Sequence, residues 1–390
     1  MPVNNRIAAN AAEFTAWRRD LHTHPELGFE EHRTSDIVAS KLASWGIEVT
    51  RGIAGTGVVG TLKLGNSPRA LGIRADMDAL AMTEANDFEH QSQNPGRMHA
   101  CGHDGHTAIL LAAARHLSET RNFDGTVHFI FQPAEEGGGG GRVMVEEGLF
   151  ERFPCDFVFG LHNDTALPIG TMLVAPGPRS AASDRIEINI TGRGGHAARP
   201  QQTIDPLLVG CHIVLALQSL VARRTDPLDS AVVSVTQFHA GSAGNVIPQT
   251  AWLHGTVRTL LPETRDMIEH EMTRIVEATA AAHGAEAKLD YQRGYPQVIN
   301  NDDATDRAAM AAAKVVGAEN VIRAAVPRMG GEDFSYMAQK VPGCFVRVGQ
   351  GRPGQENVPV HHPRYDFNDD ILPIGASLWA ALVEQELPRA

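Results

Sequence analysis

The stretch TVHFIF at residues 126–131 decides the fold class. Its Val, Ile and Phe residues favour a buried β-strand. A helical pattern precedes it at about residues 107–118, and after a further helix a second short strand follows at residues 157–161. Strands that alternate with helices in this way indicate an α/β layer with a largely parallel sheet.

The same alternation continues on both sides of this stretch. Helices are predicted within residues 6–45, with a break at His24-Pro25, and at residues 304–316 and 372–385. Strands are predicted at residues 57–64, 70–74 and 344–348. The two ends of the chain therefore predict one discontinuous catalytic domain, residues 1–180 plus 295–390.

The middle third has a different pattern. It reads as strand, helix, strand, strand, helix and strand, at residues 185–191, 205–223, 231–238, 250–259, 262–282 and 287–292. This order is typical of the ferredoxin-like unit, in which four antiparallel strands are backed by two helices. Residues 181–294 therefore predict an inserted α+β domain.

Composition and charge narrow the class of protein. The chain has 390 residues, with 43% hydrophobic and 21% charged residues, which is ordinary globular usage for two or three domains. A formal net charge of -12 argues against nucleic-acid and anionic-membrane partners. The opening residues lack the apolar core of a secretory signal, and four scattered cysteines are typical of a reducing compartment. We therefore expect a cytoplasmic protein.

Two glycine-rich motifs do not predict a nucleotide site. Residues 55–60 match GxGxxG, but the third glycine opens a predicted strand, whereas a dinucleotide site needs a helix there. A hairpin turn is predicted instead. The glycine run at residues 137–141 lacks the Lys-Ser/Thr of a phosphate loop, and we expect it to give backbone freedom beside a crowded site.

The densest group of candidate ligands is HACGHDGH at residues 99–106, directly before a predicted helix. Cys and His are the ligands that zinc and similar divalent ions prefer, so Cys101 and His103 are candidate metal ligands. Zinc-finger and zinc-deaminase sites are excluded, because the sequence contains no Cys-x-x-Cys.

Further donors follow other predicted strands. Glu135 and Glu136 come directly after the stretch 126–131, at the sheet edge where ligands collect, so one can bind metal while its neighbour takes a proton from water. His162 follows the strand 157–161, and His361 lies near the C-terminus. With Cys101 and His103, these residues supply enough donors for one or two divalent ions.

Two carboxylates and three residues of the inserted domain complete the candidates. Asp76 and Asp78 follow the strand 70–74 and are expected to orient metal ligands. In the inserted domain, His196 follows the first strand, Asn245 lies in the β-β loop and Arg258 ends a strand. An Arg and an Asn at neighbouring strand ends can clamp a substrate carboxylate.

These motifs together resemble the metal-dependent aminoacylase and carboxypeptidase G superfamily of amidohydrolases, most closely its hippurate hydrolase and indole-acetyl-amino-acid hydrolase branch. The resemblance covers nearly the whole chain. The motifs are HTHPEL (22–27), RADMDAL (74–80), HACGHDGH (99–106), Glu135-Glu136, Gly195-His196, Asn245 with Pro248, GGEDF (330–334) and HHP (361–363). It implies an α/β catalytic domain with an inserted lid or dimerisation domain.

The resemblance also implies roles for the candidate residues. Two divalent ions, zinc or manganese, with cobalt or nickel as substitutes in vitro, would be held by five ligands: Cys101, His103, Glu136, His162 and His361. Glu135 would be the general base, and His196 would assist at the oxyanion, in some relatives from the other subunit of a dimer. Asn245 and Arg258 would hold the amino acid's carboxylate. We accordingly expect a homodimer or a higher homo-oligomer.

Two positions depart from the family pattern. Where the wider superfamily has a metal-binding His two residues before the orienting Asp78, this chain has Asp76, and the Cys101 cluster would supply that donor. Position 81 is Ala where the branch usually has Pro, which affects a local turn and no ligand.

The predicted function is hydrolysis of N-acyl amino acids to a carboxylic acid and a free amino acid. A dipeptidase or carboxypeptidase of the same superfamily is one alternative, because it also holds a substrate carboxylate. A catalytically silent protein that binds amino-acid conjugates is an alternative of another class, which the intact base Glu135 and the full set of ligands disfavour.

Overall fold

The computed structural model describes residues 3–389, which form two compact units. Unit 1 contains the described residues of Met1–Gly177, Ile299–Val326 and Asp333–Ala390, and unit 2 contains Pro178–Val298 and Pro327–Glu332. The first two residues and the last residue of the expected catalytic domain lie outside the described residues. Unit 2 is thus an insertion in the chain of unit 1.

An eight-stranded sheet forms the centre of unit 1, in the order β1-β2-β4-β3-β5-β16-β6-β15. The strands are β1 (Glu48–Ile53), β2 (Gly57–Leu64), β3 (Ala70–Asp76), β4 (Gly125–Gln132), β5 (Phe157–Pro168), β6 (Met172–Leu173), β15 (Val321–Ile322) and β16 (Gly343–Gly351). The four central strands β4, β3, β5 and β16 are mutually parallel, and β2 joins β4 antiparallel. The predicted mixed, largely parallel sheet is confirmed.

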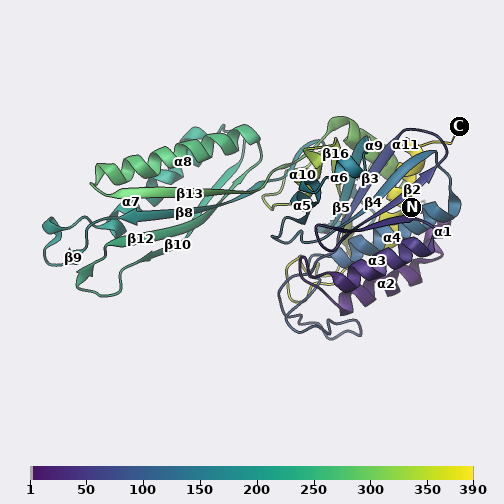
Figure 1. Cartoon of the computed structure of the whole chain (residues 1–390), viewed down its shortest axis with the longest axis horizontal. Coiled ribbons are helices and arrows are strands. Elements are labelled where there is room, and N and C mark those ends of the chain that lie inside the picture. The colour runs from purple at the N-terminus through teal and green to yellow at the C-terminus, as the bar shows by residue number, and fades with distance from the viewer. Residues whose placement is uncertain (1–2, 390) are drawn as a thin grey trace. The chain divides into compact units, whose positions relative to one another are not determined.

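Helices of unit 1 pack around this sheet (Figure 1). They are α1 (Asn5–Ala8), α2 (Ala11–Thr23), α3 (His32–Ser44), α4 (His103–Thr120), α5 (Gly140–Glu146), α6 (Leu149–Arg152), α9 (Asp302–Val316), α10 (Phe334–Ala338) and α11 (Leu372–Glu386). Helix α4 contacts β3 on one side and α2 and α11 on others, and its residues 103–114 are all buried. Its middle stretch, residues 108–114, is apolar on all sides and must be enclosed, which explains the central place of the helix.

Unit 2 is a four-stranded antiparallel sheet backed by two helices, which confirms the predicted ferredoxin-like unit (Figure 1). Its elements are β8 (Ala182–Thr191), α7 (Pro206–Ser219), β10 (Ala231–Ala240), β12 (Thr250–Thr259), α8 (Pro262–Ala282) and β13 (Glu286–Tyr295). The strand order is β10-β12-β8-β13, and β9 (Gly195–His196) pairs separately with β11 (Val246–Ile247). A further small sheet pairs β7 (Gly177–Ser180) with β14 (Val298–Asn300).

One helical segment of the described chain, Pro206–Arg224, is long and apolar enough to cross a membrane by length and composition alone. Its residues Val209, Ile213 and Leu217 are buried in the core of unit 2. A core helix of this kind passes the same test, so the finding is weak evidence for a membrane span.

Three local differences from the sequence predictions bear on the site. Helix α4 begins at His103 and not near residue 107, so His103 and His106 lie in its first turn. Strand β5 continues to Pro168, so His162 lies within a strand and not after its end. The motif at residues 55–60 forms the predicted hairpin, with β2 antiparallel to the unpredicted strand β1.

Candidate metal centre

The five predicted ligands lie together in unit 1, in two groups that share one residue. The ligand atoms of Cys101, His103 and His162 lie within 4.8 Å of one another, and so do those of Cys101, Glu136 and His361. Cys101 Sγ lies 3.2 Å from His162 Nε2, and His361 Nε2 lies 3.1 Å from Glu136 Oε1. Because Cys101 belongs to both groups, one thiolate can serve two ions.

The nitrogen atoms of His103 show which of its sides faces the centre. Nδ1 lies 3.2 Å from Asp78 Oδ1, whereas Nε2 is buried and has no hydrogen-bond partner among residues 3–389. Buried polar atoms are normally satisfied, and a metal ligand is one class of exception. The donor set and this unpaired nitrogen fit a divalent metal centre.

Asp78 connects the ligands with the predicted general base. Besides His103, its Oδ1 accepts the backbone N–H of Glu135 at 2.9 Å, and its Oδ2 accepts that of Glu136 at 2.9 Å. One buried carboxylate thus orients the imidazole of the candidate ligand His103 and two successive residues of the loop after β4.

The other two histidines of residues 99–106 have different surroundings. His106 Nδ1 lies 2.6 Å from Asp76 Oδ1 and its Nε2 2.7 Å from Asn163 Oδ1, so both ring nitrogens are engaged. Asp76, His103 and His106 also lie within 4.8 Å of one another, but this second triad has no free nitrogen on His106. His99 is buried, and neither of its ring nitrogens has a hydrogen-bond partner in the described chain. Of these three histidines, only His103 belongs to a ligand group with Cys101, and His106 is hydrogen-bonded to Asp76.

Burial and charge shift the pKa values of three of the predicted ligands. Burial raises the pKa of the Cys101 thiol well above its usual value, and burial lowers the pKa of His162 well below its usual value. His162 is therefore neutral, as a metal ligand must be. Burial opposes protonation of His103 as well, but the Asp76 carboxylate raises the pKa of His103 well above its usual range. The negative charge of Asp76, which favours a proton on the His103 imidazole, also favours a metal ion beside it.

Asp76 itself is held by a buried network beneath the centre. Although burial alone would raise it, the Arg74 guanidinium, 2.7 Å from Asp76 Oδ2, holds the pKa of that carboxyl well below its usual range. Arg74 Nη2 also donates to Asp333 Oδ1 at 2.9 Å, and Asp333 accepts N–H groups of Gln132 and Gly141. The sequence predicted no role for Asp333, which lies in the GGEDF motif at residues 330–334.

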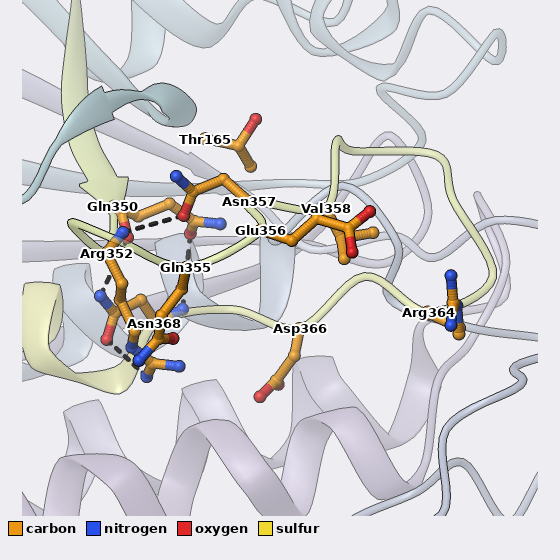
Figure 2. Close-up of a pocket in the computed structure, with 10 residues that line it drawn as sticks. All are labelled: Thr165, Gln350, Arg352, Gln355, Glu356, Asn357, Val358, Arg364, Asp366 and Asn368. Carbon is orange, nitrogen blue, oxygen red and sulfur yellow. Dashed lines mark hydrogen bonds between the residues drawn. The ribbon is translucent and has the colours of Figure 1, made fainter.

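Hydrogen bonds of Arg352, directly after β16, hold the loop that carries His361 (Figure 2). Arg352 donates two hydrogen bonds, from its N–H to Asn357 Oδ1 at 2.8 Å and from Nη2 to Asn368 Oδ1 at 2.9 Å. Asp366 lies 3.3 Å from Arg18 Nη1. These contacts enclose a polar cavity of about 180 Å³. His361 itself has a left-handed backbone, with a φ of 64°, and its N–H donates to Ala100 O at 2.7 Å.

In unit 2 the predicted lid residues fall into two places. His196 in β9 is paired with Val246, and Ala197 N donates to Asn245 O at 3.0 Å, so His196 and Asn245 lie near each other. Arg258 is paired with Ser183 at the other end of β12. Arg258 lies eight residue steps along the strand from Thr250, about 26 Å. The prediction that Asn245 and Arg258 stand at neighbouring strand ends is therefore wrong, because the β-β loop and Arg258 lie at opposite ends of one strand.

Comparisons with known proteins agree with this geometry. Residues 72–385 match the model of peptidase family M20/M25/M40. The chain is 41% identical to hippurate hydrolase of Campylobacter jejuni, with 95% of each chain covered, and 39% identical to an IAA-amino acid hydrolase of Arabidopsis thaliana, with 97% and 88% covered. It also resembles the crystal structure of Bacillus subtilis YxeP, a dinuclear metal-binding peptidase of the M20 family, with a TM-score of 0.85, 36% identity and 97% and 99% coverage.

The chain belongs to peptidase family M20/M25/M40 and is a hydrolase of amide bonds within it. The predicted resemblance to the hippurate hydrolase and indole-acetyl-amino-acid hydrolase branch is confirmed.

Proposed function

We propose that this protein is a metal-dependent hydrolase of N-acyl amino acids, which it cleaves to a carboxylic acid and a free amino acid. The observation that carries the proposal is the pair Glu135-Glu136 after β4: Glu136 lies in a ligand group with Cys101 and His361, and the neighbouring Glu135 belongs to no group that contains Cys101. The substrates named for the hippurate and IAA-amino acid hydrolases support an acyl group on an amino acid.

Cys101, His103, Glu136, His162 and His361 would hold two divalent ions, zinc or manganese. When bound, these ions polarise the amide carbonyl and lower the pKa of water. Glu135 accepts the proton of the attacking water and delivers it to the leaving amine nitrogen, which balances the hydrolysis. Asp78, through the Glu135 N–H, holds the loop in the position from which this carboxylate acts.

Residues of unit 2 complete the proposal. His196 assists at the oxyanion, and Asn245 and Arg258 hold the substrate carboxylate. Because Asn245 and Arg258 lie at opposite ends of β12, we propose that they reach one active site from two subunits of a homodimer. The edge position of β10 and the exposed Leu208 and Leu215 of α7 support an interface on unit 2.

A substrate panel tests this function. Protein stripped with a chelator is reloaded with zinc or manganese and given N-acetyl, N-benzoyl and indole-acetyl amino acids beside an unblocked dipeptide, and release of free amino acid is measured. We expect metal-dependent release from acylated substrates. Release from the dipeptide alone would favour a dipeptidase, and metal binding without release from any substrate would favour a binding protein.

The variant Glu135→Gln supplies the matched control, because it removes the base and keeps the shape of the side chain. We expect turnover to fall by about 10²- to 10⁴-fold. The metal content should stay that of the unmodified protein.

The four cysteines form no disulfide among the described residues, which supports our further proposal of a cytoplasmic location.

A further inference from the structure

The loop that follows β4 is held by a second buried carboxylate, which the proposed mechanism does not use. We call residues 133–139, between β4 and α5, the catalytic loop. Glu31, which directly precedes α3, is fully buried, and its Oε1 accepts the backbone N–H of Ala134 at 2.9 Å. Its Oε2 accepts the hydroxyl of Thr56 at 2.5 Å.

This contact extends the set made by Asp78. Glu31 binds the N–H of Ala134, and Asp78 binds the N–H groups of Glu135 and Glu136. Three successive peptide N–H groups thus donate to two buried carboxylates from separate segments of the chain. Because an unpaired buried N–H costs about 1–3 kcal/mol, these contacts restrict the loop to one conformation.

The backbone of Ala134 has an unfavourable conformation, so it needs contacts that hold it in place. Its φ of 52° lies in the left-handed region, which is unfavourable for a residue with a Cβ. The Ala134 side chain lies between two glycines: a Cβ on Gly28 would be 2.9 Å from the Ala134 Cβ, and one on Gly138 would be 2.7 Å from it. Ala134, whose backbone is strained, therefore directly precedes Glu135 and packs where only small neighbouring residues fit.

We propose that Glu31 is a positioning residue for hydrolysis, which fixes the Ala134 peptide and with it the directions of Glu135 and Glu136. The inference rests on the proposed function, since it assigns Glu31 to the base and ligand of that reaction. Thr56 orients Glu31 in turn, so the hairpin motif at residues 55–60 contributes to the site through one hydroxyl.

Two substitutions at Glu31 test this role. Glu31→Ala removes the acceptor, and at saturating metal we expect kcat to fall by about 10- to 100-fold with KM within about twofold, since partners that orient a metal site have effects of this size. Glu31→Gln should largely restore kcat, because the amide oxygen can accept the Ala134 N–H while the amide N–H₂ donates to Thr56.

Glu26→Ala is the matched control. Its carboxylate accepts the N–H groups of Arg33 and Thr34, at 2.9 and 2.8 Å, in the first turn of α3. This variant should lose thermal stability and keep the kcat of the metal-loaded protein. A Glu31→Ala protein that is less stable but has unchanged kcat would show a merely structural role and overturn the proposal.

Hydrogen exchange of the loop amides gives a readout that needs no substrate. We expect the amides of residues 134–136 to exchange at least about tenfold faster in metal-loaded Glu31→Ala than in the unmodified protein or Glu26→Ala. If the unmodified protein cleaves no substrate, the proposed function fails, and exchange still decides the role of Glu31: unchanged protection would overturn it.

A second variant covers the case in which Glu31→Ala does not fold. Thr56→Val keeps the shape of the side chain and removes the hydroxyl that orients Glu31. We expect a smaller loss of kcat, about three- to tenfold, with faster exchange of the same amides. Unchanged kcat and exchange in this variant would contradict the proposal.

Discussion

Asp78 Oδ1 lies 3.2 Å from Nδ1 of His103, so the opposite nitrogen of that imidazole is the one directed to the metal centre. The same carboxylate accepts the N–H groups of Glu135 and Glu136. A single side chain therefore contacts both a candidate metal ligand and the loop of the proposed base, which makes its removal informative.

Asp78→Asn should weaken both properties. The amide offers one accepting oxygen where the carboxylate offers two, so a backbone N–H of the loop or the His103 contact is lost. We expect about 10- to 100-fold weaker metal affinity and a comparable loss of kcat at saturating metal. Chelator competition and steady-state kinetics measure the two effects.

Asp124→Asn is a suitable control for that substitution. Asp124 also accepts two backbone N–H groups, from Asn66 and Ser67 at 2.8 Å each, but it lies before β4 whereas the catalytic loop follows β4. It should change stability without changing metal affinity. Equal effects of the two substitutions on metal affinity would refute the role of Asp78.

His103→Asn and His106→Asn should differ in metal stoichiometry. His103 Nε2 is buried and has no hydrogen-bond partner among the described residues, although it lies 3.7 Å from Asp76 Oδ2, whereas both nitrogens of His106 are hydrogen-bonded, to Asp76 and Asn163. We expect His103→Asn to bind fewer ions at micromolar free metal, and His106→Asn to keep both ions while losing about 1–3 kcal/mol of stability. Elemental analysis and denaturant unfolding measure this, and loss of an ion only in His106→Asn would reverse the assignment.

The buried His22 should make stability depend on pH. Its ring nitrogens lie 2.8 Å from Asp104 Oδ2 and 3.2 Å from Glu84 Oε1. Burial opposes protonation, but these two carboxylates raise the pKa of His22 to about 9. The charged imidazole therefore stabilises the fold fully below about pH 6.5, the unfolded value, and this contribution is lost as the pH rises through about 9.

His22→Gln is expected to lower the free energy of unfolding by about 3 kcal/mol at pH 6 and by much less at pH 10. Urea unfolding at both pH values measures the difference. His24→Gln is the control, since His24 is partly exposed and its Nδ1 lies 2.9 Å from the backbone O and 3.6 Å from the partly exposed Oδ1 of Asp20. A penalty for His22→Gln that is the same at pH 6 and pH 10 would contradict the charged state.

Mixing two inactive variants tests whether His196 acts across a dimer. In a mixture of equal parts Glu135→Gln and His196→Ala, half of the dimers would be mixed, and each would contain one intact site if His196 comes from the partner subunit. After subunit exchange we expect about one quarter of the unmodified activity. If His196 serves its own subunit, every site keeps one defect and no activity returns.

Much of the architecture followed from local patterns in the chain. Apolar strands such as residues 126–131 and the alternating strand 185–191 predict a buried parallel sheet and an inserted antiparallel one, because periodicity records how many faces of an element are covered. Residue chemistry likewise identified Cys101, His103, Glu136, His162 and His361 as donors, and the structure brings their ligand atoms together.

Only the tertiary structure decided what each polar group contacts. The three histidines of residues 99–106 have different partners in the structure, and Glu31 and Asp333 acquired roles through contacts with residues far along the chain. The ends of β12 showed that Asn245 and Arg258 are far apart. Sequence by itself determined the elements and the donors, because both are local properties; which donor meets which acceptor depends on strand order and register, which the tertiary fold alone sets.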